Sequence, residues 1–243
     1  MQLYTKVAVV CLLFVIFVLI LLCMQRPIIF SERYWIKVNK KKHKELHDIL
    51  KHTKQIFLDN QVQYFLKSGT LLGSIRNQKF IPWDDDVDIG VTYDSSTTSK
   101  QQILEKYKAM FEDNEYLFCK EGGRSEPLML RIFSKKNGKL WIDLFFLTKS
   151  NGKYIHVSKG KKRNKLLLNF IAKEWFEEKQ LETLSMCELN NEEYPCPSEP
   201  LKYLNRLYGD IRIQKLTHVH HNPFHAKVIV YFVNLLKLDN RIK

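Results

Sequence analysis

Four aspartates within five residues constrain this chain more than any other feature of its sequence. The segment 84–88 reads DDDVD, in a chain of 243 residues whose formal net charge is +13. The overlapping segment 87–91 (VDIGV) alternates in the way that is typical of a half-buried β-strand. Side chains two residues apart in a strand point to the same face, so we expect Asp86 and Asp88 to project together.

Two carboxylates held this close repel each other unless a cation or a proton lies between them. Carboxylate oxygens are hard ligands, which suit Mg2+ or Mn2+. The alternative is a solvated Asp-rich turn that caps an element. The Pro82-Trp83 pair before the cluster and the strand pattern after it favour a metal site. Trp83 itself is either a core residue or a ring on which a base stacks.

A small polar turn, Ser68-Gly69-Thr70, precedes the acidic cluster, and the basic residues Arg76 and Lys79 lie between the two. The turn has the composition of a short helix entry, where backbone N–H groups can face a phosphate. Glycine permits close approach of such a ligand. We therefore expect Ser68, Gly69 and Thr70 to contact phosphate, with Arg76 and Lys79 adding positive charge.

The segment 69–91, GTLLGSIRNQKFIPWDDDVDIGV, resembles the signature of the LicD/fukutin family. The resemblance extends to 141–145 (WIDLF), which carries Asp143, and to 203–210, and it covers most of the chain between residues 60 and 221. It implies an α/β (α+β) fold of the nucleotidyltransferase type, a mixed sheet flanked by helices. It also implies transfer of a phospho-alditol or phosphocholine group from a CDP-linked donor to a glycan.

Together with this resemblance, the acidic residues suggest a mechanism. Asp86, Asp88 and Asp143 would hold one or two Mg2+ (or Mn2+) ions against the diphosphate of a donor such as CDP-choline or CDP-ribitol. The ions would neutralise charge on the phosphoryl oxygens as CMP leaves. Asp84 or Asp85 would order a water or act as base on the acceptor hydroxyl, which makes Asp84 a candidate catalytic residue with the three metal ligands. The expected partners are the donor, a glycan or glycoprotein acceptor and a membrane, and no nucleic acid.

Two other functions stay open. The first is a catalytically silent relative that binds a glycan or a nucleotide. We consider it because bigger fukutin-type relatives carry a large extra domain between anchor and core that we do not find in this sequence, and acceptor recognition would then be incomplete. A nucleotidyltransferase acting on RNA or protein is the other, since 39 basic residues outnumber 26 acidic ones and favour anionic partners. The complete acidic set argues against the first, and the apolar N-terminal run argues against the second.

An uncharged run of 18 residues, VAVVCLLFVIFVLILLCM, occupies positions 7–24. About 20 residues cross the hydrocarbon core of a bilayer, so this length is near the minimum for a membrane-spanning helix. A signal peptide has a shorter apolar core and a small-x-small cleavage site, which this run does not show. We predict a tail at 1–6, an uncleaved transmembrane helix at 7–24, a basic stem at 25–42 and the catalytic domain at 43–243.

The charges beside this run conflict with the family resemblance. Lys6 precedes the run, whereas several basic residues follow it in the segment 26–42, so the positive-inside rule would place the main domain in the cytosol. The resemblance implies a single-pass type II protein of the Golgi or endoplasmic reticulum with a lumenal catalytic domain. We follow the resemblance on this point.

Hydrophobic periodicity predicts the remaining elements. An Asn137-Gly138 hairpin signal would place Asp143 in the same sheet as Asp86 and Asp88. The expected helices are 43–60, 101–111, 166–184, 200–208 and 226–238, and the expected strands are 62–66, 87–91, 116–119, 128–133 and 139–147.

Three cysteines lie outside the apolar run, Cys119, Cys187 and Cys196. An odd number allows one disulfide and one free thiol. Cys187 and Cys196 flank a proline-containing loop and are the natural pair if the domain is lumenal.

The sequence leaves the role of two clusters open, a run of basic residues at 159–165 and a group of histidines at 218–225. The segment 159–165 (KGKKRNK) is a solvated loop or an electrostatic lip for an anionic substrate. His218, His220, His221 and His225 can bind metal, contact phosphate or act as base, or they form a polar loop. His220 and His221 stand where bacterial relatives often carry a histidine pair.

Overall fold

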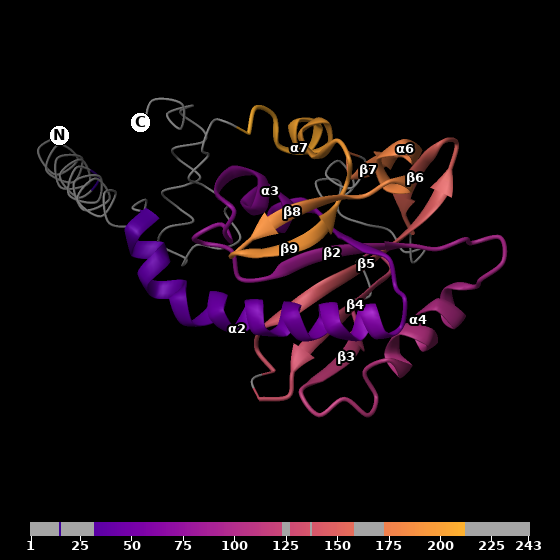
Figure 1. Cartoon of the computed structure of the whole chain (residues 1–243), viewed down its shortest axis with the longest axis horizontal. Coiled ribbons are helices and arrows are strands. Elements are labelled where there is room, and N and C mark those ends of the chain that lie inside the picture. The colour runs from indigo at the N-terminus through magenta and orange to yellow at the C-terminus, as the bar shows by residue number, and fades with distance from the viewer. Residues whose placement is uncertain (1–14, 16–31, 123–126, 137, 158–172, 212–243) are drawn as a thin grey trace, which may run out of the picture. The chain divides into compact units, whose positions relative to one another are not determined.

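The computed structural model describes residues 15, 32–122, 127–136, 138–157 and 173–211. Residues Lys41 to Arg212 form one compact unit. This unit contains a seven-stranded mixed sheet, a separate two-stranded sheet and helices beside them (Figure 1). The expected class, a mixed sheet flanked by helices, is confirmed.

The described elements follow one another along the chain as helices and strands of mostly short length. They are α2 (Glu32–Asp59), β1 (Tyr64–Leu66), α3 (Ser68–Asn77), β2 (Val87–Thr92), α4 (Lys100–Ala109), β3 (Leu117–Glu121), β4 (Met129–Ser134), β5 (Trp141–Ser150), β6 (Lys153–His156), β7 (Trp175–Glu177), α6 (Glu178–Glu182), β8 (Ser185–Leu189), β9 (Glu192–Cys196) and α7 (Pro200–Tyr208).

The large sheet has the strand order β1-β2-β5-β4-β3, with β6 paired to β5 and β7 paired to β6. Strands β2 and β5 are parallel, and the other neighbours in this sheet are antiparallel. The hairpin expected from Asn137-Gly138 is confirmed as the antiparallel pair β4–β5, although Asn137 lies outside the described residues. Asp143 therefore shares a sheet with Asp88, as expected, whereas Asp86 directly precedes β2 and is not part of the strand.

Alternation along β2 and β5 gives the sheet two chemically different faces. On one face Val91 is the register partner of Phe146, and both are fully buried. Tyr107 of α4 packs on Phe146 with ring centroids 5.2 Å apart, and Phe57 of α2 packs on Tyr107 at 6.0 Å. This face, covered by α2 and α4, is the apolar core of the unit.

The opposite face carries the acidic residues. Asp88 of β2 and Asp143 of β5 are register partners. Both lie on this face because they alternate along their strands with the apolar residues of the other face. Phe65 of β1 meets Phe176 of β7 at 5.2 Å, and Phe176 stacks on Tyr203 of α7 at 4.1 Å. Helices α3 and α7 therefore pack on the face that carries the acidic residues.

Two predicted helices differ from the structure. The helix expected from His43 begins at Glu32, because the lysine-rich segment before His43 favours a helix by propensity although it has no apolar period. The helix expected over 166–184 is confirmed at 178–182, which form α6, and is wrong at 175–177, which form β7. Phe176 is fully buried between two half-buried neighbours, which is the pattern of a strand.

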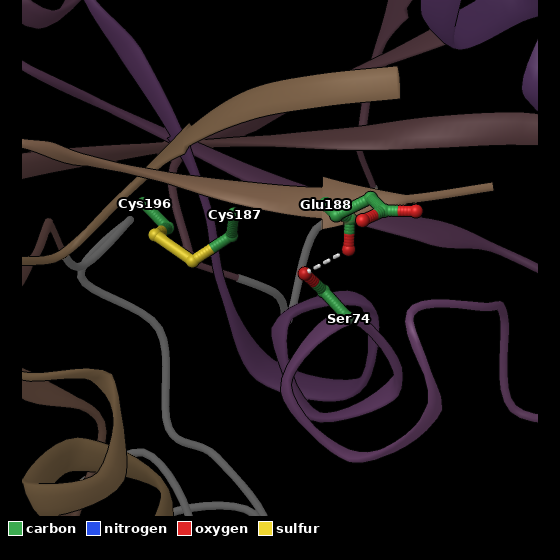
Figure 2. The surroundings of a disulfide bond; sticks show 4 residues. All are labelled: Ser74, Cys187, Glu188 and Cys196. Atoms are coloured by element: carbon green, nitrogen blue, oxygen red, sulfur yellow. Dashed lines mark hydrogen bonds between the residues drawn. A yellow bond between two sulfur atoms is a disulfide. The ribbon is translucent and has the colours of Figure 1, made fainter. Parts of the chain in front are cut away.

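The predicted disulfide between Cys187 and Cys196 is confirmed, with Cα atoms 5.9 Å apart (Figure 2). It joins β8 to β9, so the expected loop is a hairpin in which Pro195 lies on β9. The two-residue turn is Asn190-Asn191, whose φ angles of 52° and 64° are the left-handed values that such turns require. The hairpin contacts α3 through a hydrogen bond from the Ser74 hydroxyl to the carbonyl of Glu188, 2.7 Å long.

Within the described residues, no helix combines the length and apolar character needed to cross a bilayer. The predicted transmembrane segment at 7–24 lies outside the described residues except for Val15, and so does the helix predicted at 226–238.

Candidate active site

Three of the predicted catalytic aspartates lie together at the start of β2 and β5. One carboxylate oxygen each of Asp86, Asp88 and Asp143 lies within 4.8 Å of the other two. Asp88 and Asp143 reach this position because their strands are parallel neighbours in register, and Asp86 directly precedes β2. Three carboxylate oxygens at this spacing fit a hard divalent cation. The structure thus brings together the residues that the sequence predicted as metal ligands.

This arrangement is electrostatically unfavourable without a cation. Loss of hydration, followed by the repulsion of Asp86, raises the pKa of Asp88 to about 8. Loss of hydration, followed by the repulsion of Asp88, raises the pKa of Asp143 to about 7, against the opposing effect of Arg131. The Nε atom of Arg131 lies 3.0 Å from Oδ1 of Asp143. A bound cation would take the place of the protons that these carboxylates otherwise retain near neutral pH.

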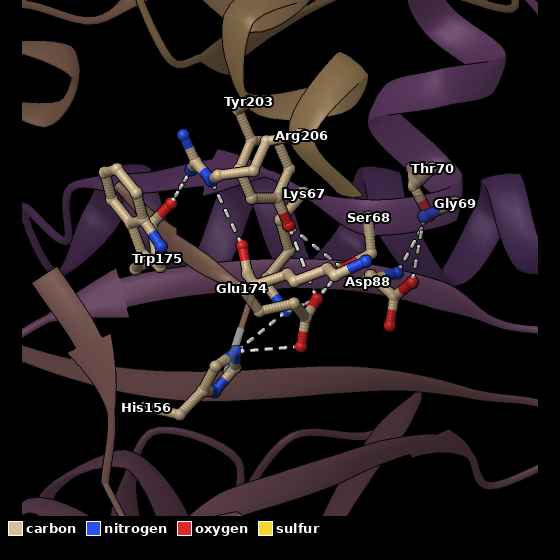
Figure 3. Close-up of polar contacts among 11 residues, drawn as sticks. Lys67, Ser68, Gly69, Thr70, Asp88, His156, Glu174, Trp175, Tyr203 and Arg206 are labelled. Carbon is tan, nitrogen blue, oxygen red and sulfur yellow. Dashed lines mark hydrogen bonds and ion pairs between the residues drawn. The ribbon is translucent and has the colours of Figure 1, made fainter. Parts of the chain in front are cut away.

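The turn that begins α3 holds Asp88 through three hydrogen bonds (Figure 3). The Gly69 N–H donates to Oδ2 of Asp88 (3.3 Å), the Asp88 N–H donates to Oγ1 of Thr70 (2.8 Å), and the Lys67 N–H donates to the Asp88 carbonyl (3.2 Å). Gly69 and Thr70 therefore bind the protein's own aspartate in this structure. Their expected contact with a phosphate stays a prediction.

Position 69 has no room for a side chain. A Cβ atom there would lie 2.8 Å from Oδ2 of Asp84 and 3.7 Å from Oδ2 of Asp88, so Gly69 lets two carboxylates flank the start of α3. Asp84 is 8% exposed, and its burial, together with the repulsion of Asp86 and Asp88, raises its pKa well above the ordinary value. Its carbonyl oxygen accepts a hydrogen bond from Nε2 of His43 on α2, 2.9 Å long.

A buried ionic network beneath this turn was not predicted from the sequence (Figure 3). The Lys67 Nζ is fully buried 3.0 Å from Oε1 of Glu174, and the other oxygen of Glu174 lies 3.0 Å from Nε2 of His156. The hydroxyls of Ser68 and Tyr203 both donate to Oε1 of Glu174. Five side chains from four separate parts of the chain thus meet beside Asp88.

Glu174 is the centre of this network. Burial opposes its ionisation, but Lys67 and His156 outweigh burial and lower the pKa of Glu174. The ionised carboxylate holds the hydroxyl of Ser68, whose φ of 46° lies in the left-handed region that a serine rarely adopts. Ser68, predicted to contact phosphate, therefore has a protein partner that holds the turn in shape. A lysine directly after the apolar strand 64–66 was the available signal for this network.

The other predicted site residues lie outside the turn that begins α3. Arg76 is in the last turn of α3, about 10 Å along the helix axis from Gly69, and Lys79 is exposed beyond that helix. Their expected role toward a phosphate stays a prediction. Trp83 is 7% exposed and belongs to the core. The basic segment 159–165 and the histidines of 218–225 lie outside the described residues.

Comparison with known proteins identifies a protein family whose model covers the site residues. The family model described as the nucleotidyltransferase domain of LicD/FKTN/FKRP matches residues 61–199, which include the three carboxylates and the turn that begins α3. An uncharacterized protein of Rickettsia typhi is 28% identical over 178 residues, covering 72% of this chain and 48% of that protein.

Two proteins with named activities match over shorter lengths. The lipopolysaccharide cholinephosphotransferase LicD of Haemophilus influenzae is 55% identical over 29 residues, 12% of this chain and 11% of that protein. The ribitol 5-phosphate transferase FKRP of Mus musculus is 29% identical over 91 residues, 37% of this chain and 18% of that protein. The chain spans about half the length of the rickettsial relatives, 48% and 58%.

The raised pKa values predict how pH and metal act on stability. The pKa of Asp88 is about 8 in the folded chain, against 3.8 for an unperturbed aspartate. The contribution of this residue to the free energy of unfolding is therefore fully present below about pH 4 and is lost as pH rises to 8. Without metal, Asp88→Asn should therefore equal the wild type in thermal stability near pH 4 and exceed it at pH 8. Addition of Mn2+ should stabilise the wild type more at pH 8 than at pH 6, and Asp88→Asn should show little of this gain. A larger Mn2+ effect at pH 6 would contradict this account.

The buried network predicts a large cost for removing its lysine. Lys67→Met should lower the free energy of unfolding by about 3–5 kcal/mol, because Glu174 then keeps a buried charge without its lysine partner. The matched control is Lys51→Met, which removes an exposed partner of Glu192 at 2.8 Å and should cost below about 1 kcal/mol. Urea denaturation of both variants measures the difference, and equal costs would exclude a structural role for the buried pair.

Proposed function

Because this chain belongs to the LicD/FKTN/FKRP nucleotidyltransferase-domain family, we propose that it is a metal-dependent phosphotransferase that moves a phospho-alditol or phosphocholine group from a CDP-linked donor to a glycan. Family membership indicates the general reaction, a phosphotransferase that acts on glycans with a nucleotide-linked donor. The donor, the metal dependence and the membrane attachment are the specific parts of the proposal.

The observation that carries the proposal is the grouping of Asp86, Asp88 and Asp143 within 4.8 Å. Mg2+ or Mn2+ bound there would draw charge from the phosphoryl oxygens of a donor diphosphate and so assist departure of CMP. The turn that begins α3 fixes Asp88 by hydrogen bonds to both its carboxylate and its backbone. Arg131 orients Asp143 from the neighbouring strand. Phosphoryl transfer depends mainly on positioning and electrostatic stabilisation of this kind.

Asp84 is the best placed candidate for the base. Its carboxylate and that of Asp88 both border the Cβ position of Gly69, and its pKa is raised well above that of an ordinary aspartate. A carboxylate with a raised pKa accepts a proton from an acceptor hydroxyl more readily near neutral pH. Asp84 would thus take the hydroxyl proton as the acceptor oxygen attacks the phosphorus and the bond to CMP breaks.

The head group stays a choice between two classes. The two relatives with named activities transfer choline phosphate and ribitol 5-phosphate, respectively. A panel of CDP-linked donors that contains both therefore covers the proposed chemistry.

We further propose that residues 7–24 attach the chain to a Golgi or endoplasmic reticulum membrane with the catalytic domain in the lumen. The disulfide between Cys187 and Cys196 supports an oxidising compartment, although the charges flanking the run favour the cytosol. Protease protection of the domain in intact microsomes, lost on adding detergent, would support the lumenal orientation. Digestion in intact microsomes would contradict it.

Release of CMP by the full-length chain tests the proposed reaction. With Mg2+, a CDP-linked donor and a glycan acceptor, we expect release that EDTA abolishes. Asp86→Ala and Asp88→Ala should each lower the rate by about 100-fold or more, because each variant loses a carboxylate that would hold the metal ion against the phosphoryl oxygens in the transition state. Asp84→Asn should lower the rate yet leave Mn2+ affinity close to that of the wild type.

Asp94→Asn is the control for that experiment, because Asp94 is exposed on the loop after β2. Its rate should equal that of the wild type. Full activity in both Asp86→Ala and Asp88→Ala would contradict the proposed reaction. Donor binding without CMP release under all conditions would favour a catalytically silent binding protein.

A further inference from the structure

Two rows of side chains lead from the carboxylates across the same face of the sheet to its edge strand β3. The first row is charged. Asp143 of β5 is the register partner of Arg131 on β4, and Arg131 is the register partner of Lys120 on β3. Residues in register on neighbouring strands lie on the same face, so two cations continue the line that begins with the aspartates.

The second row is aromatic and lies two residues along each strand from the first. Trp141 of β5 pairs with Phe133 of β4, and Phe133 pairs with Phe118 of β3. Ring centroids of Trp141 and Phe133 are 5.9 Å apart, and Phe133 and Phe118 are stacked at 5.1 Å with an interplanar angle of 13°. All three residues are half-buried, so each keeps part of its surface exposed.

Cations lie over the rings at both ends of the aromatic row. The guanidinium carbon of Arg131 is 5.1 Å from the ring centroid of Trp141, and the same side chain forms the ion pair with Asp143. Lys120 Nζ lies 5.1 Å from the ring centroid of Phe118. The rings therefore form an apolar row, in which Trp141 is tilted by 50° to Phe133. Positive charge borders this row, which lies directly beside a cluster suited to a metal-bound diphosphate.

We propose that the row Trp141, Phe133 and Phe118 binds the base and ribose of the nucleotide-linked donor. This inference rests on the proposed function, which places the donor diphosphate at Asp86, Asp88 and Asp143. The nucleoside is covalently joined to that diphosphate, and neighbouring strands are about 4.8 Å apart, so Phe133 on β4 lies within a nucleoside's reach of β5.

The charges favour a nucleotide over the neutral sugar of an acceptor. Arg131 stands between the carboxylates and the rings, where it would pair with the phosphate next to the ribose. Aromatic rings stack on any base, because every base has a π-face. Recognition at this row should therefore depend on the presence of a base more than on its identity.

Binding of two related ligands to the full-length chain tests this assignment. Isothermal titration calorimetry in Mn2+ would compare CDP with inorganic pyrophosphate, which has the diphosphate without the nucleoside. We expect Phe133→Leu to weaken CDP binding by about 5- to 150-fold, the usual loss of one stacked base, and to leave pyrophosphate binding unchanged. Phe133→Trp, which keeps an aromatic ring at this position, should bind CDP about as tightly as the wild type does. Tyr116→Leu is the matched control, because Tyr116 is an exposed aromatic outside the row.

The other outcomes contradict the proposal in distinguishable ways. Unchanged CDP affinity in Phe133→Leu would overturn it and favour a glycan ring on these aromatics. Equal weakening of CDP and pyrophosphate would also overturn it, since the residue would then only support the fold of the site. Wild-type binding of pyrophosphate with no tighter binding of CDP would overturn the nucleoside assignment alone. Failure of the wild type to bind Mn2+ or pyrophosphate would overturn the proposed function itself.

Discussion

Repulsion among three carboxylates is the constraint on which this structure depends. Asp86, Asp88 and Asp143 are held within 4.8 Å of one another, and two of them have pKa values raised to about 8 and about 7. Such a cluster persists only if the surrounding fold fixes it. The register of β2 on β5 fixes two of the carboxylates, and this register is specified by the apolar face that packs against α2 and α4. A slip of one residue would turn the aspartates into the core.

The second support comes from the buried ion pair of Lys67 and Glu174. A buried pair of this kind adds little net stability compared with apolar residues, because both charges lose hydration. Its effect here is to fix the positions of neighbouring groups. Glu174 holds the Ser68 hydroxyl, Ser68 begins α3, and the next two residues hold Asp88. The network thus connects β6, β7 and α7 to the geometry of one carboxylate on β2.

The sequence predicted those parts of the site that depend on local pattern. The strand that carries Asp88, the strand that carries Asp143, the start of α3 and the Cys187–Cys196 pair all follow from short motifs, and the structure agrees with each. Asp86 was also expected on the strand, but it directly precedes β2, which begins at Val87. Lys67 and Glu174 are separated by 107 positions, so their contact arises only when the sheet forms. Arg131 and the aromatic row were missed for the same reason, because strand order and register decide which side chains meet across a sheet. The strand at Trp175–Glu177 was missed because a three-residue strand next to leucine-rich sequence carries too little periodicity to be distinguished from a helix.

We propose that the three aspartates form a metal site for a nucleotide diphosphate. A crystal structure of the full-length chain with Mn2+ and CDP, with anomalous data collected at the manganese edge, would show the position of the metal. We expect an anomalous peak coordinated by Asp86, Asp88 and Asp143, with the diphosphate oxygens of CDP completing its coordination. A structure with ordered CDP and no manganese among these carboxylates, or with manganese bound elsewhere, would contradict it.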